Sequence, residues 1–252
     1  GDEILATSYD IGVAHHGGYA EQARLPADWV VKLPPGLSLH DAMALGTAGF
    51  TAGLAVVRME HDGLAPDKGP VVVSGATGGV GSIAIEILAK RGYHVVALTG
   101  KEAESDYLKG LGAKEVLLRQ SLDLAKIKPL AKETWAGAVD NLGGDVLAWM
   151  ASTMQVGGTL ASIGLAASFS LNTTVMPFIL RGVSLLGIDS VNCPMALRAE
   201  VWRHLATDMR PAHLAPGSDR MIRDIAFADL PSAFDDYIQG RAKGRVVVNI
   251  AA

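Results

Sequence analysis

The spacing of hydrophobic and polar positions changes twice along the chain and divides it into three regions. In the first region, residues 1–37, short apolar pieces surround a glycine-rich bend, and residues 28–33 read as a strand that stops at a proline–glycine cluster. In residues 38–191 apolar runs alternate with helical segments, and in residues 192–252 helical patterns precede a final apolar run. We therefore expect three parts, with the middle one forming a domain of its own.

The middle region has the pattern of a doubly wound α/β domain. Ser38 and Asp41 have the spacing of a helix N-terminus, and a helix of small residues is expected from 51 to about 59. Short, continuously apolar runs separated by helical segments indicate a parallel sheet buried on both faces. The predicted fold class is therefore α/β, with about six strands at residues 71–73, 94–98, 115–118, 137–140, 159–163 and 183–188.

The sixth strand and the tail carry two further expectations. The strand at 183–188 should lie at a sheet edge, and pairing with its copy in a homodimer would protect that edge. The tail predicts helices at 196–209 and 229–239 and a last strand at 245–250. We expect this tail to return to the β-rich region that residues 1–33 begin.

A glycine-rich loop joins the first strand of the sheet to an amphipathic helix. Residues 75–81 read Gly-Ala-Thr-Gly-Gly-Val-Gly, with Ala76 where the dinucleotide fingerprint usually has its first glycine. Small residues let the backbone approach a pyrophosphate, and the N-terminus of the following helix favours its negative charge. The pattern predicts a nucleotide site contacted by Thr77, Gly78, Gly79 and Val80, although a tight turn without a ligand would have the same pattern.

The end of the second strand distinguishes NADP from NAD. An acidic residue about 20 positions after the glycines would bind the ribose 2′-hydroxyl of NAD, but this chain has Thr99, Gly100 and Lys101 there. A hydroxyl, a flexible backbone and a cation suit a 2′-phosphate. The prediction is NADPH, with Lys101 as a solvated loop lysine the alternative.

Composition excludes several classes of protein. The 252 residues are 49% hydrophobic and carry a net charge of −4, which argues against general nucleic-acid binding and against disorder. With Cys193 as the single cysteine, a disulfide within the chain and a cysteine-based zinc site are excluded. We see neither a membrane span nor a signal segment, so a soluble cytoplasmic protein is expected. The chain starts at Gly1 in what reads as the middle of a β-rich region, which suggests a fragment or a processed product.

Several stretches, in this order, resemble the zinc-free quinone oxidoreductase branch of the medium-chain dehydrogenases/reductases. They also look like its NADPH-dependent acryloyl-CoA reductase group. The stretches are residues 15–21 (HHGGYAE), 46–52 (GTAGFTA), 74–81 (SGATGGVG), 99–101 (TGK), 187–191 (GIDSV) and 243–248 (KGRVVV).

The resemblance implies a two-lobed enzyme. A GroES-like catalytic lobe would be formed by residues 1–37 and 192–252, with a Rossmann domain at 38–191 between them. It also implies cofactor contacts at Leu165, Ile179, Ser190 and Asn249, in addition to those read from the glycine loop and the second strand.

The chain departs from the family pattern in two places. Thr47 lies about where zinc enzymes of the superfamily have a metal-binding cysteine, which supports zinc independence. Family members also begin well before Gly1, so the catalytic lobe is expected to be incomplete and to lack an active-site tyrosine.

The expected reaction is hydride transfer from NADPH to the β-carbon of acryloyl-CoA, followed by protonation of the α-carbon to give propanoyl-CoA. The small-molecule partner would thus be an enoyl-CoA thioester; the sequence identifies no proton donor. His15 and His16 are weak candidates for catalysis, Asp189 is expected to cap a turn, and Cys193 is expected to be inert. Reduction of quinones or other enones is the alternative within enzymes, and an inactive NADPH-binding module is the alternative of another class.

Overall fold

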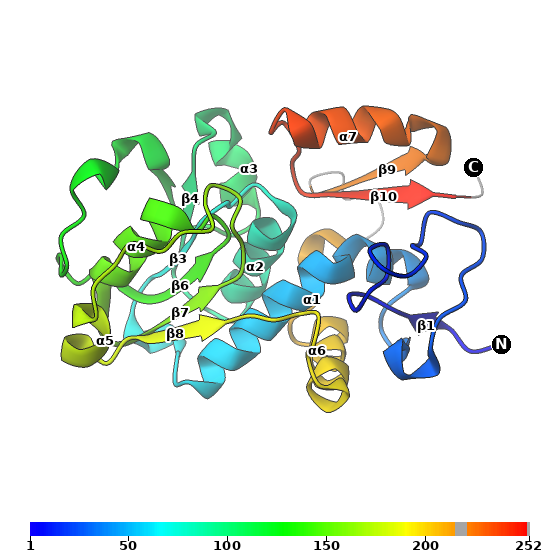
Figure 1. Cartoon of the computed structure of the whole chain (residues 1–252), viewed down its shortest axis with the longest axis horizontal. Coiled ribbons are helices and arrows are strands. Elements are labelled where there is room, and N and C mark those ends of the chain that lie inside the picture. Colours follow the sequence, from blue (N-terminus) through cyan, green and yellow to red (C-terminus); the bar gives the residue numbers. More distant parts are fainter. Residues whose placement is uncertain (215–220, 251–252) are drawn as a thin grey trace.

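The computed structural model describes residues 1–214 and 221–250, and its centre is a six-stranded parallel sheet. The strand order is β5-β4-β3-β6-β7-β8, the doubly wound order in which the first strand lies inside the sheet (Figure 1). The predicted Rossmann-type sheet is therefore confirmed, and β8 lies at its edge as expected. The strands are β3 (Val71–Val73), β4 (Val95–Thr99), β5 (Glu115–Leu118), β6 (Trp135–Asp140), β7 (Met154–Ser162) and β8 (Ser184–Gly187).

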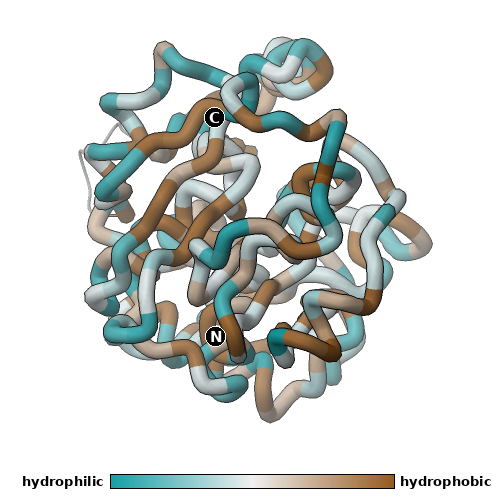
Figure 2. Tube along the Cα trace, turned by 90° about the vertical axis from the view of Figure 1, so that its left-hand side faces the viewer, coloured by the Kyte–Doolittle hydropathy of each residue, from teal (hydrophilic) through white to brown (hydrophobic). Residues whose placement is uncertain are grey.

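Helices cover both faces of this sheet, and the alternation of strand residues divides the core in two. Val71 and Val73 of β3 point to one face, where they join the core formed with α1 and α2. Val72 points to the other face, where it packs with residues of α4. In Figure 2 hydrophobic stretches run through the middle of the molecule and many outer loops are hydrophilic. The helices are α1 (Leu39–His61), α2 (Gly79–Lys90), α3 (Ser105–Gly110), α4 (Gly144–Thr153), α5 (Met176–Arg181), α6 (Met195–Ala206) and α7 (Leu230–Ile238).

Helix α1 begins where the sequence indicated but is longer than predicted. Ser38 and Asp41 form a reciprocal capping box, with Asp41 N donating to Ser38 Oγ at 3.0 Å and Ser38 N donating to Asp41 Oδ2 at 3.1 Å. Gly46 then breaks the helical geometry with φ 50° and ψ −152°, so two helical pieces meet at a kink. By length and composition α1 could cross a membrane, but 72% of its most apolar window is buried inside the structure, which is how a core helix behaves.

The two ends of the chain differ from the prediction in their strands. The strand expected at 28–33 is wrong in its first half, because a 3₁₀ turn at Ala27–Trp29 follows Pro26. The strand is limited to β2 (Val31–Lys32), which pairs antiparallel with β1 (Ile4–Leu5). The last strand, β10 (Arg245–Asn249), pairs in parallel with β9 (Ile222–Ala226), a strand that was not predicted, and not with the N-terminal strands.

The tail is thus a small βαβ unit in which α7 connects β9 to β10. The sequence did not predict β9, because the residues of this strand, Ile-Arg-Asp-Ile-Ala, lack the alternation of apolar and polar positions that is typical of a half-buried strand. The strands β1, β9 and β10 nevertheless lie on the same side of the molecule, toward the N-terminal end of α1 and away from the parallel sheet (Figure 1). Short 3₁₀ turns complete the described elements at Ala27–Trp29, Pro66–Lys68, Glu102–Glu104, Arg119–Ser121, Leu124–Lys126, Ala212–Leu214 and Phe227–Asp229.

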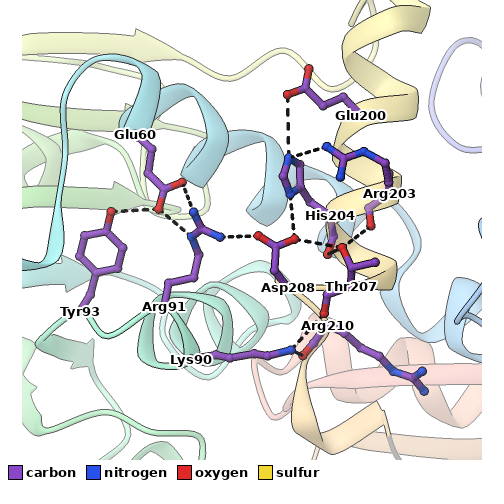
Figure 3. A network of polar contacts seen from close by, with 10 residues as sticks. All are labelled: Glu60, Lys90, Arg91, Tyr93, Glu200, Arg203, His204, Thr207, Asp208 and Arg210. Carbon is purple, nitrogen blue, oxygen red and sulfur yellow. Dashed lines mark hydrogen bonds and ion pairs between the residues drawn. The ribbon is translucent and has the colours of Figure 1, made fainter.

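A polar network ties α6 and the residues after it to α1 and α2 (Figure 3). Arg91 lies at its centre, donating from Nε and Nη2 to the Glu60 carboxylate at 2.7 Å each and from Nη1 to Asp208 at 2.6 Å. His204 of α6 contacts the same Asp208 at 2.8 Å. Hydrogen bonds from His204 and Thr207 hold the pKa of Asp208 at about 2, although its partial burial opposes this. The network fixes α6 against the Rossmann domain.

Candidate nucleotide site

The glycine loop between β3 and α2 is built for close approach of backbone to backbone. Gly75 has a positive φ of 57°, which a residue with a side chain rarely adopts. A Cβ on Gly81 would lie 2.4 Å from the Gly75 carbonyl oxygen, so no side chain fits at position 81 in the first turn of α2. Gly78 supplies no side-chain cap to α2, and the amide groups of the first turn have no partners within the helix. This turn can therefore accept an anion from outside the chain.

A cleft of about 810 Å³ opens beside this turn, at the carboxyl ends of the parallel strands. Ligands of open α/β sheets bind at this edge, and the volume lies within the usual range of about 300–1,000 Å³ for small-molecule sites. Five segments, from the ends of β3, β4, β5, β6 and β7, meet residues of the tail there. The lining residues are Gly75, Thr77, Gly78, Gly79, Val80, Gly81, Leu98, Thr99, Gly100, Lys101, Arg119, Asn141, Leu142, Ile163, Gly164, Leu165, Ala166, Tyr237, Gly240 and Ala242.

Two cations lie at one end of the cleft. Thr99 Oγ1 accepts a hydrogen bond from Lys101 N at 3.0 Å, and Lys101 Nζ donates to the Ala242 carbonyl at 3.0 Å. Arg119 follows β5 and crosses beside Gly100, because a Cβ on Gly100 would lie 3.5 Å from Arg119 Nη2. The sequence analysis missed Arg119. The available signal was its place directly after the third predicted strand, where a parallel sheet brings strand ends together.

The tail closes one side of the glycine loop. Gly244 N donates to the Thr77 carbonyl at 2.9 Å, and Arg245 Nε donates to the Ala44 carbonyl at 2.8 Å. The Arg245 guanidinium also lies against the first turn of α2, since a Cβ on Gly79 would be 3.0 Å from its Nη1. Burial lowers the pKa of Arg245 from its usual value, and nearby tyrosines oppose this. The Arg245 guanidinium is thus a third positive group, after Lys101 and Arg119, and it lies at the end of α2 that can accept an anion.

A buried carboxyl group shapes the turn after β6. Asp140 is fully buried and accepts hydrogen bonds from Ser74 Oγ and from the Gly143 amide, both at 2.7 Å. Burial raises the pKa of Asp140, and these hydrogen bonds oppose the shift. Asn141 Nδ2 donates to the Ser74 carbonyl at 2.7 Å. These bonds hold Asn141 and Leu142 in the cleft wall next to the glycine loop.

The structure brings together eight of the eleven residues expected to contact the cofactor. Thr77, Gly78, Gly79, Val80, Thr99, Gly100, Lys101 and Leu165 line one cleft. The other three lie outside that lining. Ile179 is on α5 with 71% of its surface exposed, Ser190 follows β8, and Asn249 ends β10. The contacts of all eleven with a cofactor stay a prediction.

The remaining polar candidates have structural surroundings. Asp189 caps its turn as expected, accepting from Val191 N at 2.8 Å and from Asn192 N at 3.0 Å. Burial raises the pKa of Cys193, which lowers its reactivity. His15 Nδ1 lies 3.1 Å from the His16 carbonyl oxygen, and its ring packs edge-on against the rings of His16 and Trp29. Over residues 1–214 and 221–250, no three His, Cys, Asp or Glu side chains are placed to hold a metal ion.

Comparison with known proteins gives a consistent picture. Residues 79–207 match the zinc-binding dehydrogenase family. The chain is 51% identical over 250 residues to the putative quinone oxidoreductase YhfP of Bacillus subtilis, covering 99% of this chain and 75% of the relative. It is 47% identical over 252 residues to the acrylyl-CoA reductase AcuI of Ruegeria pomeroyi, covering 100% and 75%.

Solved structures agree with the sequence relatives. The yhdH oxidoreductase of Salmonella enterica, crystallised with NADP, has a TM-score of 0.94 at 47% identity, covering 99% of this chain and 75% of that one. The B. subtilis YhfP structure holds NAD and has the same TM-score of 0.94, with 99% and 75% coverage.

Proposed function

Since the chain belongs to the zinc-binding dehydrogenase family, we propose that it is an NADPH-dependent oxidoreductase that reduces an activated carbon–carbon double bond, with acryloyl-CoA as its substrate. The observation that carries the cofactor half of this proposal is the pair of cations, Lys101 and Arg119, at one end of the glycine-loop cleft. The substrate half rests on the 47% identity to the acrylyl-CoA reductase AcuI.

The residues present fit a dinucleotide phosphate. Gly78, Gly79 and Gly81 carry no side chain at the start of α2, and the amides of its first turn have no partners within the helix, so a pyrophosphate can approach them. Arg245 adds a positive charge on the opposite side of the same turn. Lys101 and Arg119 suit a 2′-phosphate, because a cation replaces the carboxylate that would bind an unmodified ribose.

The chain's own residues would orient and shield the reaction. When bound, the dihydronicotinamide supplies a hydride to the β-carbon, and a proton then reaches the α-carbon, so that acryloyl-CoA becomes propanoyl-CoA and NADPH becomes NADP⁺. Holding the two reactants in one geometry supplies much of the acceleration in such reactions. Leu165, Ile163 and Leu142 give the cleft an apolar wall that limits access of water.

We propose that the substrate side is formed by residues 1–37 and 192–252 and the nucleotide side by residues 38–191. The position of β1, β9 and β10 on one side of the molecule, away from the parallel sheet, supports this division (Figure 1). Zinc independence is also proposed, because Thr47 stands about where the superfamily's zinc enzymes have a cysteine. A cytoplasmic location is supported by a single, buried, free cysteine.

A direct assay tests the function. NADPH oxidation would be followed with acryloyl-CoA and with a simple quinone, in the chain as printed and in the full product of its gene, with NADH in parallel. We expect acryloyl-CoA turnover that depends on NADPH and is unchanged by a chelator. NADPH binding without turnover in either form would refute the reductase and favour an NADPH-binding module.

Quinone reduction is the second candidate, and the 51% identity to the putative quinone oxidoreductase YhfP favours it. Fold and cofactor would be the same, so the two candidates differ only in the substrate that is turned over. A higher kcat/KM with the quinone than with acryloyl-CoA would replace the proposed substrate.

We also propose a homodimer formed through the edge of β8. The edge is flanked by exposed apolar side chains, with Leu185 38% exposed and Leu180 59% exposed. Light scattering after gel filtration should give twice the chain mass, and Leu185→Lys should give the single-chain mass. A monomeric wild-type protein would refute this assembly.

A further inference from the structure

A buried arginine without an acidic partner joins the two proposed sides of the molecule. Arg198 of α6 has 1% of its surface exposed and forms no ion pair with a described carboxylate, although its charge contributes to lowering the pKa of the nearby Asp189. Its Nε is buried without a hydrogen-bond partner. A buried cation is costly, and replacing it with an apolar residue of similar size is often neutral or stabilising. Stability alone is therefore a weak reason for an arginine here.

The contacts of the Arg198 side chain use both the edge and the faces of its planar guanidinium group. Nη1 lies 3.3 Å from the Thr7 carbonyl, whereas Nη2 donates to the Ser190 carbonyl at 2.9 Å and to the Val191 carbonyl at 3.2 Å. The ring of Tyr9 lies 4.6 Å from the guanidinium carbon, and the ring of Phe50 in α1 lies 4.7 Å from it. A planar fork can stack on rings and donate along its edge at the same time, which an ammonium group cannot do.

The N-terminal segment that Arg198 holds is strained. Ser8 and Tyr9 have φ values of 72° and 51°, in the left-handed region that costs energy for residues with a side chain. Ser8 Oγ is buried without a partner. Such conformations persist where the surroundings impose them, and they gather at functional sites. Arg198 supplies part of that constraint, through Thr7 on one side and the Tyr9 ring on the other.

The second segment that Arg198 holds is the turn 189–192 after β8. Because the sheet is parallel, the carboxyl end of β8 lies at the same edge as the glycine loop. Asp189 organises this turn from the solvent side by accepting from the amides of Val191 and Asn192. Arg198 holds it from the protein side through two carbonyls. The turn is thus fixed at both faces, next to the edge where the nucleotide is proposed to bind.

We propose that Arg198 is a positioning residue for hydride transfer: it fixes the turn 189–192 to the segment 7–9 and thereby sets how the nucleotide side meets the substrate side. This inference rests on the proposed reductase function. Arg198 itself lies in the protein interior and acts through Ser190, Val191 and Thr7.

The test compares variants that separate positioning from folding. Arg198→Lys keeps the charge and removes the fork, Arg198→Ala permits rescue by added guanidinium, and Asp189→Ala loosens the same turn from an exposed position. Arg181→Lys is the matched control. Its guanidinium also donates to backbone carbonyls, those of Ser152, Met154 and Ala131. Arg181 is the last residue of α5, and these carbonyls are not part of the turn 189–192.

Two kinds of measurement are needed. The first is steady-state kinetics with NADPH and NADPH deuterated at the transferred position. The second, independent of turnover, is hydrogen–deuterium exchange of segments 7–9 and 188–193 in the full protein. We expect Arg198→Lys and Asp189→Ala to lower kcat up to about 100-fold, the effect of a misplacement near 1 Å. The isotope effect on kcat should rise, because hydride transfer becomes rate-limiting.

Exchange should increase in 188–193 for Arg198→Lys and Asp189→Ala, and in 7–9 for Arg198→Lys only. The affinity for NADPH should fall by a smaller factor than kcat, since the glycine loop and the two cations are untouched and Ser190 is the one expected cofactor contact that lies in the loosened turn. Millimolar guanidinium should restore part of kcat in Arg198→Ala, whereas Arg181→Lys should lower the melting temperature and leave kcat unchanged. A variant at Arg198 with a lower melting temperature but wild-type kcat, isotope effect and exchange would overturn the proposal. If the wild-type protein binds NADPH but reduces no enone, the proposed function fails, and exchange still decides whether Arg198 couples the two segments.

Discussion

Replacing Arg119 with methionine should weaken NADPH binding and leave NADH binding unchanged. The side chain is exposed and makes no hydrogen bond or ion pair with the described residues, so its removal leaves no buried group without a partner. Its guanidinium lies beside Gly100, at the end of β4 where a 2′-phosphate would project. Arg119→Met therefore tests the phosphate contact with little effect on the fold.

The magnitude follows from the type of contact. A hydrogen bond to a charged group contributes about 1.5–3 kcal/mol, and exposure places Arg119 at the lower end of that range. A loss of about 1.5–2 kcal/mol raises the Kd of NADPH by roughly 10–30-fold. NADH has no 2′-phosphate, so its Kd should stay within about twofold of the wild-type value.

The assay is fluorescence titration of both nucleotides at low and high salt. Lys114→Met is the matched control. Lys114 is an exposed cation directly before β5, at the opposite end of that strand from Arg119. It changes the net charge equally and should leave both affinities unchanged. Equal losses for NADPH and NADH in Arg119→Met, or an equal loss of NADPH affinity in the control, would refute the assignment of Arg119 to the 2′-phosphate.

Three further changes have defined outcomes. Gly81→Ala would place a methyl group 2.4 Å from the Gly75 carbonyl oxygen, so we expect about 1–3 kcal/mol of destabilisation and loss of NADPH binding, measured by thermal shift with and without NADPH; an unchanged melting temperature would contradict the geometry. Burial raises the pKa of Tyr107 from 10.0 to about 12, so the native state keeps this proton longer and stability falls as pH rises from 10 to 12; in urea unfolding, Tyr107→Phe should reduce that fall, and an identical slope would refute it. Arg91→Met would leave the half-buried Glu60 carboxylate with the Tyr93 hydroxyl but without a cation and should cost about 1–3 kcal/mol, whereas no loss in urea unfolding would show that the Arg91 contacts of Figure 3 contribute nothing to stability.

The periodic parts of this fold were readable from the sequence because local and global preferences agree there. Six short apolar runs, rich in residues that favour β-strands, predicted the six strands. Ser38 and Asp41 marked the start of α1. The glycine spacing of residues 75–81 predicted the strand–loop–helix turn, since Gly75 adopts a positive φ and position 81 has no room for a side chain.

Other features depended on contacts between residues distant in sequence. The pairing of β9 with β10 is decided by the crossover helix α7, and the letters of β9 alone do not indicate a strand. Arg119 joins the candidate site because β5 lies beside β4 in the sheet, 18 residues after Lys101 by residue number. Neither neighbourhood has a local sequence pattern, so spacing could not predict it.

By itself, the sequence determined the strands of the Rossmann-type sheet, the glycine turn and the place of Lys101 directly after the second strand, because each of these has a local pattern of neighbouring residues. Only the tertiary structure decided that Arg245 faces the first turn of α2 and that Arg198 joins segments 7–9 and 189–192. The physical reason is that burial, ring stacking and carbonyl contacts around a guanidinium depend on where distant segments pack, and a sequence pattern does not contain that information.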